Sequence, residues 1–295
     1  PVMTLRHFTI FLAVCEEMNM TKAAAKLHMT QPSVSQAIRE LEDYYNTPLF
    51  ERLGRKLYLS ESGKRLQPYV SQILTLNRFI DSMMHGHNEN FPIRLGASLT
   101  IGETLLVQVM KDITALAPQQ EIVSEIHNTD ELQAMLLNDT LDIALIEGQI
   151  TAPTLVADPF MIDELILVVP RAWQSMVPST ITTEELPSIK LFLREEGSGT
   201  RSLFEGLIKE RHIPLQIVGN YNNTASLKQA VIAGFGGTVI SRRLVTEELQ
   251  AGLMTHIPIT DLSLQRLFSI VYHKDKYINK SLQRVIDVAH DLINK

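Results

Sequence analysis

Polar side chains of the kinds that bind the edges of DNA bases recur at helical spacing within QPSVSQAIRELE, residues 31–42. Ser33, Gln36 and Arg39 follow one another at intervals of three residues. Glutamine can bind adenine and arginine can bind guanine through paired hydrogen bonds in the major groove. The apolar residues of the segment form a separate stripe: Val34, Ile38 and Leu41. At about 100° per residue, a helix that buries this stripe turns the polar residues toward solvent.

Further signals in the neighbouring residues predict where this helix begins and which part of it could enter a groove. Thr30 is a suitable N-cap, and Pro32 suits the first turn and also faces outward. Glu40 and Asp43 lie further along the same outer side and would repel phosphates. Only the N-terminal half of the helix should therefore enter a groove.

A preceding helix, over residues 21–27, is expected to support this one. Thr21 is its predicted N-cap, and the residues of its buried side are Ala24, Ala25 and Leu27. His28-Met29 forms the break between the two helices. A two-stranded wing is expected over residues 49–60.

The charge of the chain is uneven. The 295 residues carry a net charge of −6, but residues 1–88 hold ten Lys/Arg against eight Asp/Glu. Within residues 52–65, five basic residues face only Glu61: Arg52, Arg55, Lys56, Lys64 and Arg65. We expect Arg52, Arg55 and Lys56 to bind backbone phosphates, which supplies affinity without sequence preference. The residues alone also fit an ordinary three-helix bundle with a solvated polar face.

Residues 62–84 predict one long helix, on the order of 35 Å at about 1.5 Å per residue. Its apolar residues repeat at intervals of four and three, with one polar residue in the seam: Leu66, Val70, Ile73, Asn77, Ile80 and Met84. A heptad seam of this kind pairs helices, and a lone Asn can set their register. The pattern predicts dimerisation; packing against the chain's own domain is the alternative.

Beyond residue 89, short β-like runs such as IRLGA, EIVSEI, LDIALI, LILVVP and LFSIVYH alternate with helical stretches. This alternation predicts α/β units with largely parallel sheets. About 205 residues fit two such lobes better than one.

Several helix starts in this part follow strand-like runs and bear hydroxyl groups beside backbone N–H groups, an arrangement that suits a polar or negative ligand. The candidates are Ser98, Thr100, Thr129, Gly197, Ser198, Gly199, Thr200, Arg201 and Thr224. In the loop Gly197–Arg201, the glycines permit close approach and the arginine adds a positive charge. Each stretch is also an ordinary capping sequence.

The N-terminal 60 residues resemble the winged helix-turn-helix of LysR-type transcriptional regulators. The matching motifs are Ala-Ala-x-x-Leu, Thr-Gln-Pro-Ser-Val-Ser, Leu-Glu, Pro-Leu-Phe-Glu-Arg and Leu-Ser-Glu-Ser-Gly. Ser60 stands where the family usually has Thr. The remainder agrees with the family in length and element order, with weaker motifs.

The resemblance implies a DNA-binding domain over residues 1–61, a dimerising linker helix over 62–88 and an effector-binding domain over 89–295. Lobe I would comprise about 89–162 and 266–295, and lobe II about 163–265, as in periplasmic binding proteins. The residues expected to contact DNA are Thr21, Gln31, Pro32, Ser33, Ser35, Gln36, Arg39, Arg52, Arg55 and Lys56. The candidate hydroxyl and glycine residues would line an effector cleft between the lobes.

The implied function is sequence-specific regulation of transcription, controlled by a small polar or anionic metabolite. The implied partners are double-stranded DNA and further copies of the chain, in a homodimer or homotetramer. RNA polymerase is a third implied partner. A solute-binding module that uses the lobes alone is the alternative. It leaves the basic residues 52–65 unexplained.

Little in the sequence indicates catalysis, a cofactor or a metal. Ser198 lies outside a Gly-x-Ser-x-Gly motif, and no third ligand clusters with His85 and His87. Cys15, the single cysteine, suits a core position, with a redox switch as the alternative. The apolar run 8–15 is too short to span a membrane. We therefore expect a cytoplasmic regulator that is not an enzyme.

Overall fold

The computed structural model describes residues 3–54, 56–84 and 91–292. The chain divides into two compact units, one of residues 1–89 with 137–139 and the other of residues 90–136 and 140–295. Each unit is described by itself.

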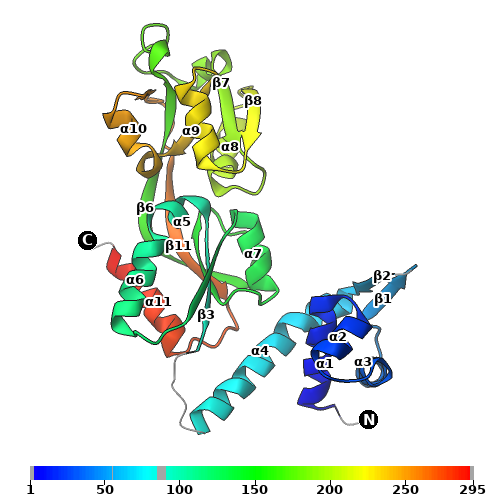
Figure 1. The fold of residues 1–295 in the computed structure, drawn as a ribbon. Helices are drawn as coiled ribbons and strands as arrows, with labels where there is room; N and C mark the ends of the chain where they lie inside the picture. The colour runs from blue at the N-terminus through cyan, green and yellow to red at the C-terminus, as the bar shows by residue number, and fades with distance from the viewer. Residues whose placement is uncertain (1–2, 55, 85–90, 293–295) are drawn as a thin grey trace. The chain divides into compact units, whose positions relative to one another are not determined.

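The N-terminal unit is a three-helix domain followed by a hairpin and a long helix (Figure 1). Its elements are α1 Leu5–Glu17, α2 Met20–Lys26, α3 Gln31–Tyr45, β1 Phe50–Leu53, β2 Lys56–Leu59 and α4 Glu61–Met84. The antiparallel pairing of β1 with β2 confirms the predicted wing. Glu42 attaches the wing to α3, because its carboxylate accepts the backbone N–H groups of Leu49 and Phe50 at 2.7 and 3.1 Å.

Helices α2 and α3 are both capped by a polar side chain, but only the cap of α3 was predicted correctly. The prediction that Thr21 caps α2 is wrong: Asn19 is the N-cap, and its side chain accepts the N–H groups of Thr21 and Lys22. Asn is as good a cap as Thr, and it stands two residues earlier. Ala25 was also misplaced, since Ala23 and Ala24 are buried and Ala25 is exposed. The predicted cap of α3 is confirmed, with Thr30 accepting from Ser33 N–H.

The apolar seam of the long helix α4 is buried at its start and exposed toward its end. Val70 is fully buried in the core of the N-terminal unit, and Leu66 packs against the same core. Ile73, Ile80 and Met84 are exposed. The first turns of α4 therefore belong to the domain itself, and only the later part of the seam remains open.

The C-terminal unit consists of two α/β lobes connected by two long strands (Figure 1). The elements of the first lobe are β3 Ile93–Ala97, α5 Leu99–Thr104, α6 Leu106–Leu116, β4 Ile122–Ile126, α7 Thr129–Leu137, β5 Ile143–Glu147 and the C-terminal α11 Lys280–Asp291. Those of the second are β7 Lys190–Arg194, α8 Gly199–Glu210, β8 Gln216–Tyr221, α9 Thr224–Ile232, β9 Gly237–Ser241, α10 Thr246–Gln250 and β10 Met254–His256. Short 3-10 helices cover 171–173, 183–188 and 242–244.

The two connecting strands are β6, Leu155–Pro170, and β11, Gln265–His273. They pair antiparallel with each other from Gln265↔Glu164 to His273↔Leu155. β11 also pairs with β5 in the first lobe, and β6 continues to β9 in the second. The sheets are thus mixed, parallel over β4-β3-β5 and over β8-β7-β9, which corrects the expectation of largely parallel sheets.

Each lobe has its own apolar core. The first is formed by the sheet with α6 and α11, and includes Phe160, Phe268 and Val285. The second includes Leu167, Phe204 and Val239. The predicted architecture, a winged helix-turn-helix with a long helix and then two α/β lobes, is confirmed. Within the described ranges, no helix is both long and apolar enough to cross a membrane.

Candidate functional site

The outer face of α3 is polar and open, as its spacing predicts. Val34, Ile38 and Leu41 are buried in the core of the N-terminal unit. The exposed residues of the opposite face are Pro32, Ser33, Gln36 and Arg39. Because α3 begins at Gln31, these side chains occupy its first turns, where a recognition helix contacts base edges.

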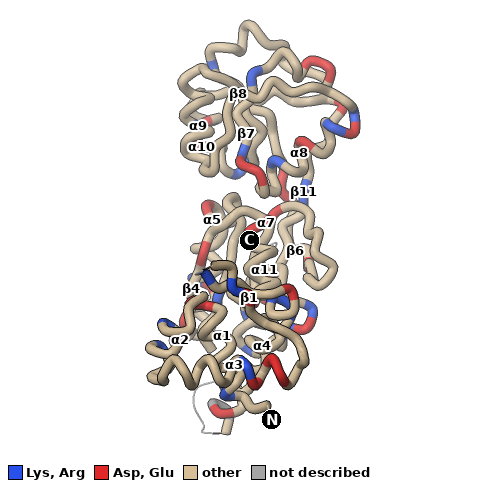
Figure 2. The backbone as a smooth tube through the Cα atoms, turned by 90° about the vertical axis from the view of Figure 1, so that its right-hand side faces the viewer, with Lys and Arg blue, Asp and Glu red and all other residues tan. Residues whose placement is uncertain are grey.

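The other residues expected to contact DNA differ in exposure. Thr21 is exposed, and Gln31 and Ser35 are half-buried and bonded to each other, Nε2 to Oγ, at 3.1 Å. Arg52 in β1 and Lys56 in β2 are exposed on the wing, whose basic residues are blue beside β1 in Figure 2. Arg55 lies outside the described residues.

Glu40, which was expected only to repel phosphates, is bonded within the domain. Its Oε2 accepts from His7 Nε2 at 3.0 Å, and its Oε1 accepts from Gln36 Nε2 at 2.9 Å. These hydrogen bonds lower the pKa of Glu40, the one from His7 most. This connection was not predicted, since nothing in the spacing of the sequence places His7 of α1 against α3.

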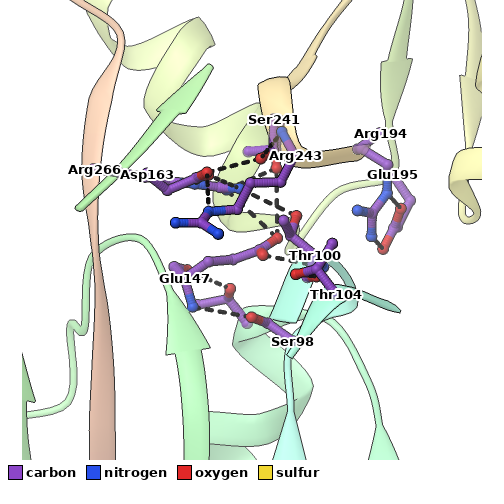
Figure 3. A network of polar contacts seen from close by, with 12 residues as sticks. Ser98, Thr100, Thr104, Glu147, Asp163, Arg194, Glu195, Ser241, Arg243 and Arg266 are labelled. Carbon is purple, nitrogen blue, oxygen red and sulfur yellow. Dashed lines mark hydrogen bonds and ion pairs between the residues drawn. The ribbon is translucent and has the colours of Figure 1, made fainter. Parts of the chain in front are cut away.

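The second polar constellation lies where the two lobes meet and is centred on Arg266 (Figure 3). The Arg266 side chain is 2% exposed. Its guanidinium binds Asp163 at 2.8 Å and lies 3.5 Å from Glu147, both carboxylates being equally buried. It also donates to the hydroxyls of Thr200 and Thr100 at 2.8 and 3.1 Å. One cation therefore bridges two carboxylates and hydroxyls of both lobes.

The Glu147 carboxylate lies at the start of α5, where a polar or negative ligand was expected. The backbone N–H of Thr100 donates to Glu147 Oε2 at 3.1 Å. Ser98 Oγ accepts the Glu147 backbone N–H at 3.0 Å, and Thr129 Oγ1 donates to the Glu147 carbonyl at 2.9 Å. The candidate hydroxyls of the first lobe thus converge on one strand end of β5.

The loop before α8 brings the second lobe to the same place. The carbonyl of Gly197 accepts the backbone N–H of Asp130 in α7 at 3.2 Å, and a Cβ on Gly199 would collide with the Glu147 carbonyl oxygen. Ser198 is 1% exposed, and its Oγ has no hydrogen-bond partner among the described residues. This orphaned hydroxyl is the clearest unused polar group of the loop.

Two further candidates, Arg201 and Thr224, make their contacts outside this network. Arg201 turns toward its own lobe, where its guanidinium binds Glu205 at 3.0 Å and donates to the Arg194 carbonyl and to Asn220. Thr224, at the start of α9, donates to the carboxylate of Glu103 in α5 at 2.6 Å. Thr224 therefore joins the lobes, whereas Arg201 braces the second lobe alone.

Several residues of the network were not among the sequence candidates, including Glu147, Asp163, Ser241 and Arg266. Ser241 Oγ donates to Asp163 Oδ1 at 2.7 Å. The available signal was a charged residue at the end of an apolar run, as in LDIALIE. A buried strand tolerates such a charge only when a partner reaches it.

No group of three or more His, Cys, Asp or Glu side chains that could hold a metal occurs in the described part of the chain. Cys15 is buried in the core of the N-terminal unit. Burial raises the pKa of its thiol to about 12, which keeps it protonated at neutral pH. A protonated, buried thiol fits a core residue.

A winged helix-turn-helix joined to two α/β lobes with a polar inter-lobe network defines a DNA-binding regulator with a ligand-responsive domain. Residues 5–64 match the bacterial regulatory helix-turn-helix protein, lysR family, and residues 88–293 match the LysR substrate binding domain. The chain belongs to the LysR family of transcriptional regulators. It is 30% identical over 285 residues to the uncharacterized HTH-type transcriptional regulator YeiE of Escherichia coli (strain K12), covering 96% of each chain.

Solved structures show the same fold at lower identity. A full-length OxyR from Pseudomonas aeruginosa is 22% identical, with a TM-score of 0.76 over 100% of this chain and 95% of that one. Full-length CbnR in complex with its target DNA is 19% identical, with a TM-score of 0.62 over 97% and 99%. The CcmR regulatory domain of Synechocystis PCC6803 in complex with 2-PG is 19% identical, with a TM-score of 0.63 over 68% and 96%.

Proposed function

We propose that the exposed face of α3 reads DNA bases and that the wing binds the phosphate backbone. The observation that carries this proposal is the separation of α3 into a buried stripe and an exposed polar face at the helix start. Gln36 and Arg39 supply the paired donors and acceptors that distinguish bases. Arg52 and Lys56 supply positive charge without base preference.

Two variants distinguish these roles. Gln36→Ala should lower affinity for the preferred site by about 1–3 kcal/mol and relax the preference at one base pair. Arg52→Ala should weaken binding to all sequences alike and reduce the slope of log K against log salt by about 1. Selection from a random duplex pool, followed by anisotropy titrations at several salt concentrations, measures both. If Gln36→Ala lowers affinity equally for every sequence, the assigned face is wrong.

The effector, in this proposal, is a small polar or anionic metabolite that binds where the lobes meet. Two features support it: the buried hydroxyls and the orphaned Ser198 Oγ at the start of α8. Glu195 and Glu196 precede the loop Gly197–Arg201, and their negative charges would weaken the binding of an anion if they pointed inward. The charge of Glu195 is compensated, because its carboxylate is paired with the buried Arg194 at 2.8 Å. The CcmR regulatory domain, which has a similar fold, was solved in complex with 2-PG.

A thermal-shift screen of the full chain against small acids, their amides and neutral polyols tests the class of effector. With an effector in hand, Thr100→Val and Ser198→Ala should blunt the shift while DNA affinity stays near that of the wild type. Arg201→Ala should matter less, because its guanidinium is held by Glu205 and Asn220. An unchanged shift in both hydroxyl variants would place the site elsewhere.

The proposed mechanism is a population shift. An effector that favours one arrangement of the lobes changes the spacing of DNA-binding domains in an oligomer. The exposed seam residues Ile73, Ile80 and Met84 of α4 supply the apolar surface for a homodimer or homotetramer. Sedimentation of the wild type against Ile80→Asp tests this step. RNA polymerase is a further proposed partner.

The regulator is proposed to act in the cytoplasm, without a cofactor and without catalysing a reaction. Its family consists of transcriptional regulators. Turnover of a ligand found in the thermal-shift screen would contradict this part of the proposal.

A further inference from the structure

A chain of hydrogen bonds leads from the start of α1 to the exposed face of α3. The backbone N–H of Thr4 donates to His7 Nδ1 at 3.2 Å. His7 Nε2 lies 3.0 Å from Glu40 Oε2, and Gln36 Nε2 lies 2.9 Å from Glu40 Oε1. The outermost member of this chain, Gln36, is one of the side chains proposed to read bases.

The direction of each hydrogen bond in this series follows from the contact between Thr4 and His7. The backbone N–H of Thr4 can only donate, and both it and the Thr4 hydroxyl lie against His7 Nδ1, at 3.2 and 2.8 Å; with Nδ1 as the acceptor, the proton of a neutral ring resides on Nε2 and is donated to Glu40. The His7 side chain is 14% exposed and that of Glu40 is 37% exposed, so the pair is partly shielded from water. Hydrogen bonds from His7 and then from Gln36 lower the pKa of Glu40, which keeps it ionised.

An ionised carboxylate only accepts hydrogen bonds, and this decides which end of the Gln36 amide faces it. The nitrogen of Gln36 must point to Glu40, since the amide oxygen would be repelled. The amide oxygen and the second N–H then remain on the open side. A base edge such as that of adenine requires one acceptor and one donor in a given order, and a rotated amide would reverse that order.

We propose that Glu40, held in place by His7, is a positioning residue that orients the Gln36 amide for base recognition. This inference rests on the proposed role of α3 in reading DNA. It assigns Glu40 a favourable effect on selectivity, although its charge opposes binding to phosphates. Loss of Glu40 should lower the base preference but should not lower the affinity for unrelated DNA. Measuring both quantities therefore separates the two effects.

The experiment uses the full chain and duplexes selected from a random pool by the wild-type protein. Gln36→Ala first identifies the base pair whose preference depends on Gln36. Glu40→Ala should lower the preference at that same base pair about tenfold, and affinity for an unrelated duplex should stay equal or rise a few-fold, because a negative charge is lost. Glu40→Gln keeps one acceptor for Gln36 and should recover part of the preference.

Asp43→Asn is the matched control. Asp43 is exposed on the same side of α3, one turn beyond Glu40, and its side chain makes no hydrogen bond among the described residues. Its loss should raise affinity for all duplexes slightly and leave the base preference intact. His7→Phe removes the support of Glu40 and should lower the preference less than Glu40→Ala does.

Three results would overturn the inference. Glu40→Ala could retain the wild-type preference at the Gln36-dependent base pair. Glu40→Ala and Asp43→Asn could change the preference equally, which would reduce Glu40 to a charge. Gln36→Ala could alter no base pair, in which case the base-reading role of α3 fails together with the inference. Thermal unfolding of each variant, followed by circular dichroism, shows whether a loss of preference comes with a loss of structure.

Discussion

The outer face of α3 and the network around Arg266 are both polar, but they are built in opposite ways. The residues of the α3 face lie within one helix, and its polar side chains are exposed. The Arg266 network joins residues between 98 and 266, and its charged groups are about 2% exposed. A solvated face can change without disturbing the fold, whereas buried charges depend on one another.

This difference has a functional consequence. The α3 face is free to exchange water for DNA. In the inter-lobe network, the hydrogen bonds of Ser98, Thr100 and Thr200 are already made within the chain. A ligand that replaces some of these bonds would couple its binding to the arrangement of the lobes.

The largest expected effect comes from removing the central cation. Arg266→Ala leaves Glu147 and Asp163 buried without their counter-charge, and should lower the free energy of unfolding by about 3–5 kcal/mol. Urea titration of the full chain measures it. Arg243→Ala is the control, since Arg243 lies 3.7 Å from the same Asp163 but is 40% exposed, and should change stability by less than about 1 kcal/mol. Equal effects of the two variants would contradict the importance of burial.

The next effect belongs to Asp142 in the first lobe. Burial raises the pKa of its carboxyl, but hydrogen bonding with Arg94 and the charges of Lys276 and Arg94 outweigh burial and lower the pKa to about 2. The native state therefore prefers ionised Asp142, which contributes about 2 kcal/mol at neutral pH. Asp142→Asn should remove this amount in urea titrations at pH 7.

The pH dependence of this contribution has a definite sign. Because the folded pKa lies below the ordinary value of 3.8, the stabilisation is complete above about pH 4 and is lost as the pH falls toward 2. The wild type and Asp142→Asn should therefore converge in stability over that range. Asp158→Asn is the exposed counterpart: Asp158 and His290 are both nearly two-fifths exposed, and the change should stay below about 1 kcal/mol.

The same contrast explains what the sequence could predict. The α3 helix, its cap Thr30 and its buried stripe follow from spacing within 15 residues, and these predictions are confirmed. The cap of α2 was wrong because Asn19 and Thr21 are both acceptable caps, and local residue type does not choose between them. Local periodicity thus predicts which face is buried better than where a helix begins.

The inter-lobe network could be predicted only in part. The hydroxyls at helix starts have a local signal, and Ser98, Thr100, Thr129 and Thr200 do converge in the structure. Glu147, Asp163 and Arg266 meet only because β6 and β11 pass between the lobes. Strand β6 was recognised over LILVVP alone, since the preceding residues 155–164 contain Asp158, Asp163 and Glu164, which interrupt the apolar run.

Replacing two glycines of helix α8 by alanine should have smaller effects on stability, of opposite sign. Gly199, at the start of α8, has no room for a Cβ beside the Glu147 carbonyl, so Gly199→Ala should destabilise the chain by about 1–3 kcal/mol. Gly206, exposed in the middle of α8, has nothing within 4 Å of a Cβ. Gly206→Ala should stabilise by about 0.5–1 kcal/mol. Thermal unfolding of both variants tests the close contact between the lobes; a stabilised Gly199→Ala would contradict it.

The smallest expected effect on stability is at Arg39. Its exposed side chain lies next to the buried Ile38, and Arg39→Ala should change the free energy of unfolding by less than about 0.5 kcal/mol. The same change should lower affinity for the preferred duplex by about 1–3 kcal/mol, because a guanidinium can bind guanine through two hydrogen bonds. Arg39→Lys keeps the charge without the planar fork, so it should retain affinity for unrelated duplexes while losing preference for guanine. Paired urea and anisotropy titrations measure both quantities, and a loss of stability equal to the loss of binding would show that Arg39 supports the fold and does not read the base.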